Sequence, residues 1–369
     1  MIYLDNGATS FHKPPEVYRA VLRAMRRCAN PGRGGYGAAM EAARQVYSAR
    51  EAAGKLFHCR PEQVIFTSSC THGLNIAIRS LVGPGDRVVI SGFEHNAVTR
   101  PLCGLGADRV VAGRKLFDWE DTLEHFEDRL KQKPKAAVFT HVSNVFGYIL
   151  PVEEMALLCR KYRVPFILDA AQSAGILDVD MEKLGAEFIA MPGHKGLLGP
   201  QGTGILLCRE RAEPLIRGGT GSESENQEMP EFLPDRLEAG TLNVPGIAGL
   251  GAGIRCLLRI GVDTIFRREH AQLEKAAAGL EKLGLRVFHG PHQAGTVSFL
   301  PGMDCEEAAD ILAGHGIALR AGLHCAPLAH ESAGTLDSGT LRISFGADAQ
   351  EAQTRGLLRA VSKLEGWKV

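Results

Sequence analysis

The chain has 369 residues, with 42 basic and 42 acidic side chains, so its formal net charge is zero. A balanced chain has no bulk electrostatic attraction for nucleic acid or for an anionic membrane, and we expect neither as a partner. Hydrophobic residues make up 45% of the sequence and charged residues 23%, which is ordinary for a globular protein with a large core. No apolar run approaches the roughly 18 residues of a membrane-spanning helix.

The first residues and the cysteines bear on the compartment. The opening stretch MIYLDNGATSF reaches a charged residue, Asp5, too early for a signal peptide. Nine cysteines are scattered along the chain, an odd number with no C-x-x-C pair. A disulfide framework or a zinc ribbon is therefore disfavoured, and no metal site is expected. We expect reduced thiols and a cytoplasmic protein.

Glycine is the one unusual component. It accounts for 43 of the 369 residues, a larger share than the roughly 7% of residues that are glycine in average proteins. The sequence has no Gly-X-Y repeat and no long Gly/Ser tract. We expect the excess to lie in short turns, where the backbone approaches a ligand closely.

Helices and apolar strands alternate in the first two thirds of the chain. Amphipathic helices are predicted over 16–28 and 39–59. This alternation predicts an α/β fold, with a mostly parallel, mixed sheet of the seven-stranded type flanked by helices on both faces. Ligands of such sheets bind beyond the carboxyl ends of the strands. The predicted strands are 64–69, 87–92, 136–143, 165–171, 188–191 and 202–208.

The pattern changes after the last of these strands. Residues 213–245 are polar and contain several Gly and Pro residues, and they are too many for a simple connector. We interpret them as a functional or subunit-contact loop. A long helix is predicted at about 262–284, followed by short strands and helices of α+β style and by a final helix over 348–365.

These elements predict two domains. The large domain spans 16–255 and contains the sheet. The smaller α+β domain consists of 256–369 together with 1–15, because the first dozen residues are expected to pack against it.

Polar residues follow most of the predicted strands. Since the carboxyl ends of parallel strands meet at one edge of a sheet, we expect these residues to gather there although they are far apart in sequence. They are Cys70, Thr71, Glu94, His95, Asn144, Asp169, Gln172 and Lys195.

Two of these residues point to a cofactor. Lys195 lies in the glycine-rich stretch MPGHKGLLGPQGTGILL, and Asp169 ends the apolar run FILDAAQ 26 residues earlier. A lysine amine forms a Schiff base with an aldehyde, and a buried aspartate holds a protonated pyridine nitrogen. A strand-end aspartate more commonly caps a turn. The pair together favours a site for pyridoxal 5'-phosphate (PLP).

The stretch TSSCTHGLNIAI runs from a strand into a helix. Free backbone N–H groups and the helix dipole at such a junction favour an anion, which predicts a phosphate cup at Ser69, Cys70 and Thr71. Plain N-capping by Ser or Thr accounts for the same pattern. The Lys-Ser/Thr pair of a P-loop is missing, so a nucleoside triphosphate is disfavoured.

Three further residues have both a functional and a structural interpretation. His95 is a candidate to stack on an aromatic cofactor or to act as an acid or base, or else is a structural histidine. Cys325 lies between polar neighbours that include Arg320 and His324, and a nearby cation lowers the pKa of a thiol, although most lone cysteines are structural. Arg342 is costly to bury unless paired, which fits either a clamp on a substrate carboxylate or a salt bridge.

Taken together, these stretches resemble the class V aminotransferase family of fold-type I PLP enzymes, and most of all its cysteine desulfurase and selenocysteine lyase branch. The matching stretches run in family order over essentially the whole chain. They are YLDNGAT (3–9), TSSCTHGLN (67–75), FEHNAV (93–98), HVSNVFG (141–147), LDAAQ (168–172), GHKGLLGPQGTG (193–204), RLEAGTLN (236–243), RAGLHCA (320–326) and LRISFG (341–346).

The resemblance implies how PLP would be held. Lys195 would attach it covalently, Asp169 would bind its pyridine nitrogen, Gln172 would lie on its ring hydroxyl side and His95 would stack on the ring. The phosphate would be held by Cys70, Thr71 and His194 of one subunit and by Gly240 and Thr241 of the other subunit of an obligate homodimer.

The resemblance also implies a reaction. Asn144 and Arg342 would hold L-cysteine, and Cys325 would accept its sulfur as a persulfide, releasing L-alanine and passing the sulfur to an acceptor protein. Alternatives are a selenocysteine lyase, a transaminase or an epimerase on the same scaffold, and a non-catalytic protein that binds a sulfur-carrier partner. A nicotinamide dehydrogenase is disfavoured, because GLGAGI (249–254) follows a loop rather than a strand.

The chain departs from the family pattern at four positions. Gly7 stands where Ala is usual, and Pro192 replaces a Ser or Thr before GHK, which removes one hydroxyl from the phosphate site. Leu323 replaces the first of two histidines before the cysteine, and Asn96 replaces the second histidine of a pair. The last two changes bear on acid or base assistance near Cys325.

Overall fold

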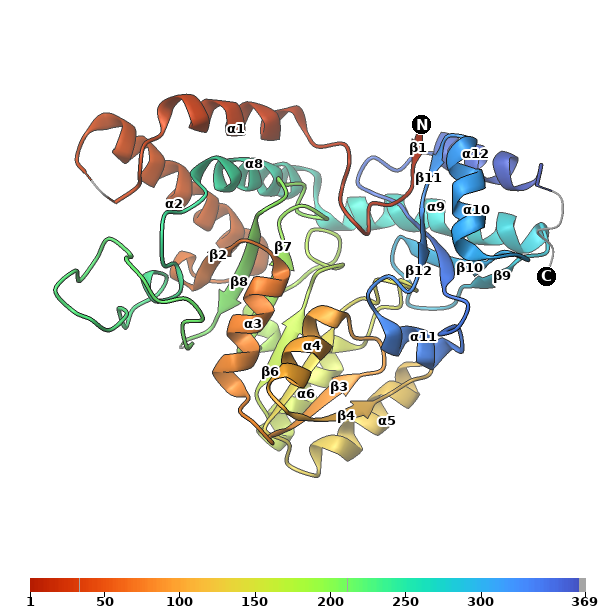
Figure 1. Cartoon of the computed structure of the whole chain (residues 1–369), viewed down its shortest axis with the longest axis horizontal. Coiled ribbons are helices and arrows are strands. Elements are labelled where there is room, and N and C mark those ends of the chain that lie inside the picture. The colour runs from red at the N-terminus through yellow and green to blue at the C-terminus, as the bar shows by residue number, and fades with distance from the viewer. Residues whose placement is uncertain (33, 211, 365–369) are drawn as a thin grey trace.

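The computed structural model describes residues 1–32, 34–210 and 212–364 (Figure 1). Its largest sheet has seven strands in the order β2-β8-β7-β6-β5-β3-β4. Neighbouring strands are parallel except at β8, which lies antiparallel between β2 and β7. The predicted mixed α/β sheet is confirmed. The strands are β2 (Val64–Thr67), β3 (Arg87–Ser91), β4 (Asp108–Ala112), β5 (Ala136–Thr140), β6 (Phe166–Asp169), β7 (Phe188–Pro192) and β8 (Gly204–Cys208).

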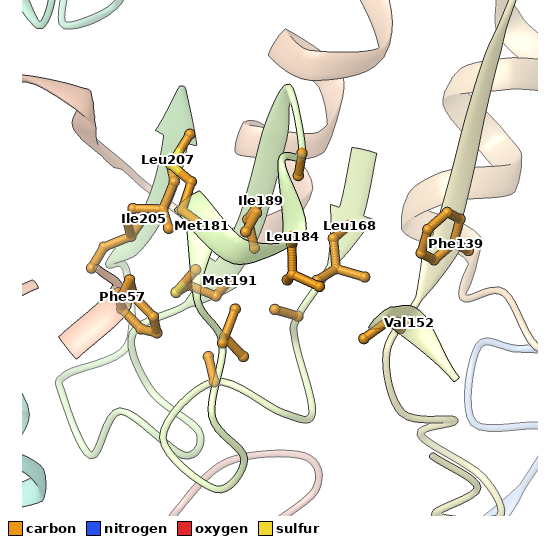
Figure 2. Close-up of a cluster of buried hydrophobic side chains, with 14 of the residues drawn as sticks. Phe57, Phe139, Val152, Leu168, Met181, Leu184, Ile189, Met191, Ile205 and Leu207 are labelled. Atoms are coloured by element: carbon orange, nitrogen blue, oxygen red, sulfur yellow. The ribbon is translucent and has the colours of Figure 1, made fainter. Parts of the chain in front are cut away.

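Helices cover both faces of this sheet, because its strands alternate large apolar side chains between the two faces. On one face, Ile65, Val138 and Ile167 pack in a core with α3 (Cys70–Leu81) and α4 (Asn96–Gly104). On the other face lies the core drawn in Figure 2, where Phe57 and Phe139 flank side chains from β6, β7 and β8. The helices of this second face are α2 (Gly37–Phe57), α5 (Trp119–Leu130), α6 (Val152–Tyr162), α7 (Met181–Leu184) and α8 (Val244–Ile260).

Strand β4 is absent from the sequence prediction. It lies at the edge of the sheet, and its first two residues, Asp108 and Arg109, are exposed. Only Ala112 at its end is buried. An edge strand that buries so little has too short an apolar pattern to be recognised.

A glycine-rich helix is the second element that the sequence prediction misses. Helix α8 (Val244–Ile260) contains Gly246, Gly249, Gly251 and Gly253, so part of the glycine excess lies in a helix and not in turns as expected. Glycine lowers helix propensity by about 1 kcal/mol per residue, and tertiary packing overrides that cost here. In Figure 1, α8 lies between α1 (Pro15–Arg27) and the sheet, with α2 beside it.

These glycines let α8 approach its neighbours closely. A β-carbon at position 251 would stand 2.8 Å from the β-carbon of Ala49 in α2. One at position 253 would stand 2.4 Å from the carbonyl oxygen of Leu197, in the loop that carries Lys195. The glycine helix therefore sets the position of the lysine loop.

A second, smaller sheet contains the C-terminal strands. It is antiparallel, in the order β12-β13-β10-β9, and beside it β1 (Ile2–Tyr3) pairs in parallel with β11 (Ile317–Ala318). The N-terminal residues thus pack with the C-terminal part of the chain, as Figure 1 shows. The elements are α9 (Val262–Lys282), β9 (Arg286–Phe288), β10 (Thr296–Leu300), α10 (Cys305–Gly314), β12 (Arg320–Gly322), α11 (Pro327–Ala333), β13 (Thr340–Ser344) and α12 (Glu351–Val361).

The domain boundaries after residues 15 and 255 stay a prediction, and the second of them falls inside α8. The last predicted helix, 348–365, is shorter than expected, and residues 365–369 of the predicted small domain lie outside the described residues. Residues 213–243 contain no helix or strand apart from one 3-10 turn over Asp235–Leu237. No single described helix is long and apolar enough to cross a membrane, and α8 with α9 meets that criterion only as a pair bent by 82°.

The close approach of α8 to the lysine loop can be tested with Gly253→Ala. The added methyl group must displace the Leu197 backbone, so we expect a loss of about 1–3 kcal/mol in the free energy of unfolding, measured with urea. Gly314→Ala is the matched control, because nothing lies within 4 Å of a β-carbon at the end of α10. The control should gain up to about 1 kcal/mol, and equal stabilities of the two variants would contradict the packing argument.

Candidate functional site

The polar residues that follow the strands do gather at one edge of the large sheet. Asp169 ends β6, where it pairs with Thr140 at the end of β5. The Sγ atom of Cys70, at the start of α3, lies 3.5 Å from Oδ1 of Asp169. Lys195 follows β7, and its charge acts on both Cys70 and Asp169. The structure therefore brings together the lysine and the aspartate that the sequence analysis singled out.

Asp169 has one oxygen engaged and one available. It is 2% exposed, and its Oδ1 accepts hydrogen bonds from the Ala171 N–H at 2.9 Å and from the Cys70 thiol. Its Oδ2 receives no hydrogen bond from any residue that the structure describes. Burial raises the pKa of Asp169, and the two donors and Lys195 oppose that shift. A cationic N–H donor placed at Oδ2 would hold the carboxylate in its ionised form.

Lys195 lies on a loop whose glycines are packed too closely against neighbouring atoms to be replaced by residues with a β-carbon. A β-carbon on Gly196 would stand 2.3 Å from the Ala174 carbonyl oxygen, and one on Gly193 would stand 2.1 Å from Oγ1 of Thr203. Burial, with the nearby Arg342 guanidinium, lowers the pKa of Lys195 to about 8. A larger share of the amine is therefore neutral, and nucleophilic, near neutral pH than for a free lysine.

The start of α3 is arranged for an anion. Ser69 caps the helix, since its Oγ accepts from the His72 N–H at 3.1 Å. The N–H groups of Cys70 and Thr71 have no hydrogen-bond acceptor among the described residues. The capping interpretation and the anion-cup interpretation therefore hold together, because the cap uses the third N–H and leaves the first two free.

His194 and Gln172 both contact the N-terminal segment. Nδ1 of His194 lies 3.1 Å from Oγ1 of Thr9, and Nε2 of Gln172 donates to the Gly7 carbonyl oxygen at 3.0 Å. Burial, followed by the charge of Lys195, lowers the pKa of His194 to about 4. Their proposed contacts to a phosphate and to a ring hydroxyl stay predictions.

His95 is the N-cap of α4, a role that the sequence analysis does not predict. Its Nδ1 accepts a hydrogen bond from the Ala97 N–H at 3.0 Å. Burial, together with Lys195 and Arg320, lowers the pKa of His95 to about 4, so the ring is neutral near pH 7. Because Nδ1 is an acceptor, the single ring proton sits on Nε2. His95 therefore presents a neutral N–H donor.

The Cys325 loop is attached to the large sheet by two hydrogen bonds. The Asn96 N–H, one residue after His95, donates to the Cys325 carbonyl oxygen at 2.8 Å. The side-chain amide of Asn144 donates to the His324 carbonyl oxygen at 2.7 Å. His324 and Cys325 both have left-handed backbone, with φ of 50° and 59°, which bulky residues adopt at a cost. Cys325 is exposed on this turn, whose backbone is bonded to the residue after His95.

Arg342 is almost completely buried in β13 and makes two bonds. Its Nη1 donates to the Asn144 carbonyl oxygen at 2.8 Å, and its Nη2 lies 2.5 Å from Oδ1 of Asp5. Its Nε is buried without a partner among the described residues. The salt bridge and the clamp are thus compatible, since these two bonds use only two of the five guanidinium N–H groups. The role of Asp5 was missed, and its place in the YLDNGAT stretch was the only signal for it.

Gly240 and Thr241 are not part of this cluster. Both are exposed, and Gly240 lines a separate cavity with residues of α2 and of the 220–235 segment. Within the described part of the chain, no group of three or more His, Cys, Asp or Glu residues could hold a metal ion.

Comparison with known proteins agrees with this geometry. The model of the family "Aminotransferase class-V" matches residues 2–357. The chain belongs to the class V aminotransferase family. A probable cysteine desulfurase of Methanothermobacter thermautotrophicus is 34% identical over 355 residues, which cover 91% of this chain and 88% of the relative.

Solved structures in this family have the same fold. The apo structure of a cysteine desulfurase from Thermococcus onnurineus NA1 has a TM-score of 0.90 at 32% identity, covering 98% of this chain and 94% of that one. A cysteine desulfurase from Escherichia coli, solved in an S-sulfonic acid form, has a TM-score of 0.83 at 26% identity, with 98% and 94% covered. The family and fold predicted from sequence are confirmed.

The bond between Cys70 and Asp169 can be tested by Cys70→Ala. Losing the thiol donor should raise the pKa of Asp169 and weaken PLP binding about threefold to tenfold, the range for one hydrogen bond to a buried acceptor. Fluorescence titration of the apo protein with PLP measures this affinity. Cys208→Ala, which removes a buried thiol from β8, is the control. Equal PLP affinities for Cys70→Ala and the wild type would rule out the contribution.

Proposed function

We propose that this protein is a PLP-dependent cysteine desulfurase, which converts L-cysteine to L-alanine and keeps the sulfur as a persulfide on Cys325. The observation that carries the proposal is the hydrogen bond from the Asn96 N–H to the Cys325 carbonyl oxygen. It fastens the turn that carries the exposed Cys325 to the residue after His95, and the charge of Lys195 acts on His95. The relatives in the same family that bear the name cysteine desulfurase support it.

The residues present fit PLP. The Lys195 amine would hold its aldehyde carbon covalently, and the free Oδ2 of Asp169 would accept the pyridine N–H. The free N–H groups of Cys70 and Thr71, at the positive end of α3, would hold its phosphate. When bound, PLP supplies a sink for the electron pair released at the substrate α-carbon.

Arg342 and Asn144 would orient the amino acid. The free Nε of Arg342 would bind the substrate carboxylate, while Asp5 and the Asn144 carbonyl fix the plane of the guanidinium. Asn144 also holds the His324 carbonyl. One residue thus ties the carboxylate clamp to the turn that carries the nucleophile, which fixes the distance between the two.

The side chains then divide the chemistry. The neutral amine of Lys195 would take the proton from the α-carbon, and the Cys325 thiolate would attack the substrate sulfur. The carbon–sulfur bond breaks as the sulfur–sulfur bond forms, and the carbon keeps the electron pair and is protonated. The proton that the Cys325 thiol gives up on ionising would balance the one added to this carbon, and His95 would stay neutral and offer its Nε2–H as a hydrogen-bond donor. In sum, L-cysteine and the Cys325 thiol give L-alanine and the Cys325 persulfide, with atoms and electrons balanced.

The position of Cys325 also separates this function from the alternatives. A transaminase or an epimerase needs Lys195 and Asp169 but has no use for an exposed cysteine on a turn that is bonded to the residue after His95. A non-catalytic sulfur-carrier partner needs neither the lysine nor the aspartate. A selenocysteine lyase would use the same residues as a desulfurase.

We propose further that the enzyme is a homodimer in the cytoplasm that passes its sulfur to an acceptor protein. Gly240 and Thr241 are exposed on a long irregular segment, as expected if they reach the phosphate bound in a second subunit. All nine cysteines are free, which suits a reducing compartment. The exposed thiol of Cys325 is open to an acceptor.

Cys325→Ala tests the nucleophile. The variant should keep the yellow absorbance of bound PLP, because no cofactor-binding group is changed, and it should form no alanine from cysteine. An alanine assay with and without a reductant measures this. Cys103→Ala, which removes another exposed thiol, should keep full activity. Full desulfuration by Cys325→Ala would refute the assignment.

His95→Asn separates the two roles of His95. Asn caps helices as well as any residue, so the free energy of unfolding should change by less than about 0.5 kcal/mol. Without the Nε2–H donor, the rate of alanine formation should fall about 10²-fold to 10⁴-fold. His95→Ala loses the cap too and should be destabilised by a further 0.5–2 kcal/mol, roughly. An Asn variant with the wild-type rate would exclude a catalytic role for the Nε2–H of His95.

A further inference from the structure

A small cavity lies on the small-sheet side of the Lys195 loop. Its volume is about 30 Å³, room for one or two water molecules. The N-terminal segment, the Lys195 loop, α9 and the turn before β10 all contribute to its wall. The polar side chains in the wall are those of Asn6, Ser10, Gln172, Lys195, Glu269 and Thr296.

Glu269 is the unexplained member of this wall. It lies on α9 and is 2% exposed, yet no described residue gives its side chain a hydrogen bond or an ion pair. Buried carboxyl groups almost always have hydrogen-bond partners, because a buried carboxyl group without a hydrogen bond costs free energy. The cavity that Glu269 lines is therefore the space in which a non-protein partner can contact its carboxyl group.

Gly295 shows how tightly the carboxyl group is placed. A β-carbon at position 295 would stand 2.7 Å from the Glu269 β-carbon and 2.8 Å from Oε2. The carboxyl group therefore lies over the backbone of the turn that leads into β10. The absence of a side chain at Gly295 is what lets Glu269 line the cavity.

The charged groups around Glu269 do not offer it a counter-ion. Asp348, in the segment after β13, is the nearest one that acts on it, and it is already paired with His12 at 2.9 Å. Arg268, the neighbour of Glu269 on α9, donates to the Ala347 carbonyl oxygen. Lys195 lines the same cavity from the large sheet. Burial and then Asp348 raise the pKa of Glu269 to about 8, which leaves the carboxyl group protonated near pH 7.

The chemistry of the wall selects the occupant. Apolar side chains from Val142, Ile176, Leu198, Ile265 and Phe345 make up much of it, so a bare cation would lose its hydration without regaining enough oxygen ligands. A water molecule needs only two to four polar partners, and the carboxyl, amide and hydroxyl groups supply them. A protonated carboxyl group both donates and accepts, as such a water requires.

We propose that Glu269 binds one or two ordered waters in this cavity, and that these waters also hydrate Lys195, which lines the same cavity. Glu269 is then a positioning residue that acts on Lys195 through solvent. The inference concerns the protein alone and does not depend on the proposed reaction.

Glu269→Gln and Glu269→Leu form the matched pair of variants. Gln keeps the shape of the Glu269 side chain and a hydrogen-bond donor. Leu has a similar volume but no hydrogen-bonding group. Magnetic relaxation dispersion of water oxygen counts long-lived internal waters, and it should find one or two fewer in Glu269→Leu than in the wild type and in Glu269→Gln. An unchanged count in Glu269→Leu would overturn the proposal.

Infrared difference spectroscopy gives a test that needs only the isosteric variant. The wild type minus Glu269→Gln should show the carbonyl band of a protonated carboxylic acid at neutral pH, and the band should fade as the pH rises through about 8. A carboxylate band in its place at neutral pH would refute the neutral acid. This test stands even where Glu269→Leu does not fold.

Loss of the cavity water should change the pKa of Lys195 in one direction. Burial lowers the pKa of a lysine, so removing its water should lower it further. The pH midpoint of covalent PLP attachment, followed by absorbance, should therefore fall in Glu269→Leu by about half a pH unit or more, and stay unchanged in Glu269→Gln. Equal midpoints in all three proteins would show that the cavity water does not reach Lys195.

Discussion

The site depends on a backbone packing constraint around the Lys195 loop. Gly193, Gly196 and Gly253 each meet a backbone or side-chain oxygen at a distance that no β-carbon could tolerate. The loop packs against the glycines of α8 and against the segment after β6. A lysine on such a loop has its Cα fixed, so the reach of its amine toward Asp169 depends on side-chain torsions alone. The other groups of the site must therefore be placed correctly relative to this fixed Cα.

Asn144 extends this constraint to the small sheet. Its carbonyl accepts from Arg342 and its amide donates to the His324 carbonyl, so β13 and the Cys325 turn are both fastened to the segment after β5. Asp5 completes the arrangement, because it brings the N-terminal segment onto the same guanidinium. Three regions of the sequence, some 340 residues apart at the extremes, thereby meet at a single arginine. The two contacts of Asn144 are buried, so removing either partner would leave a buried polar group without a hydrogen bond.

The sequence allows the sheet, the cofactor-binding edge and the family to be predicted, because buried strands and strand-end polar residues leave local patterns. Helix α8 could not be predicted in the same way, since its glycines oppose helix formation and only the partners α1, α2 and the lysine loop make it favourable. Strand β4 has no pattern because it buries almost nothing. The cap formed by His95 and the solitary burial of Glu269 depend on neighbours distant in sequence or on ring geometry, and no spacing rule reports them.

The protonation states of the site follow from its burial and give it selectivity. His95 and His194 are neutral near pH 7, and the pKa of Lys195 is lowered, because burial penalises each charged form. Asp169 has one oxygen without a hydrogen bond, and Arg342 has N–H groups without a partner among the described residues. A ligand that fits must present a cationic N–H donor to the first and a carboxylate to the second. A cofactor and substrate that lack either group would leave one of these two positions without a partner, which agrees with the proposed cofactor and substrate.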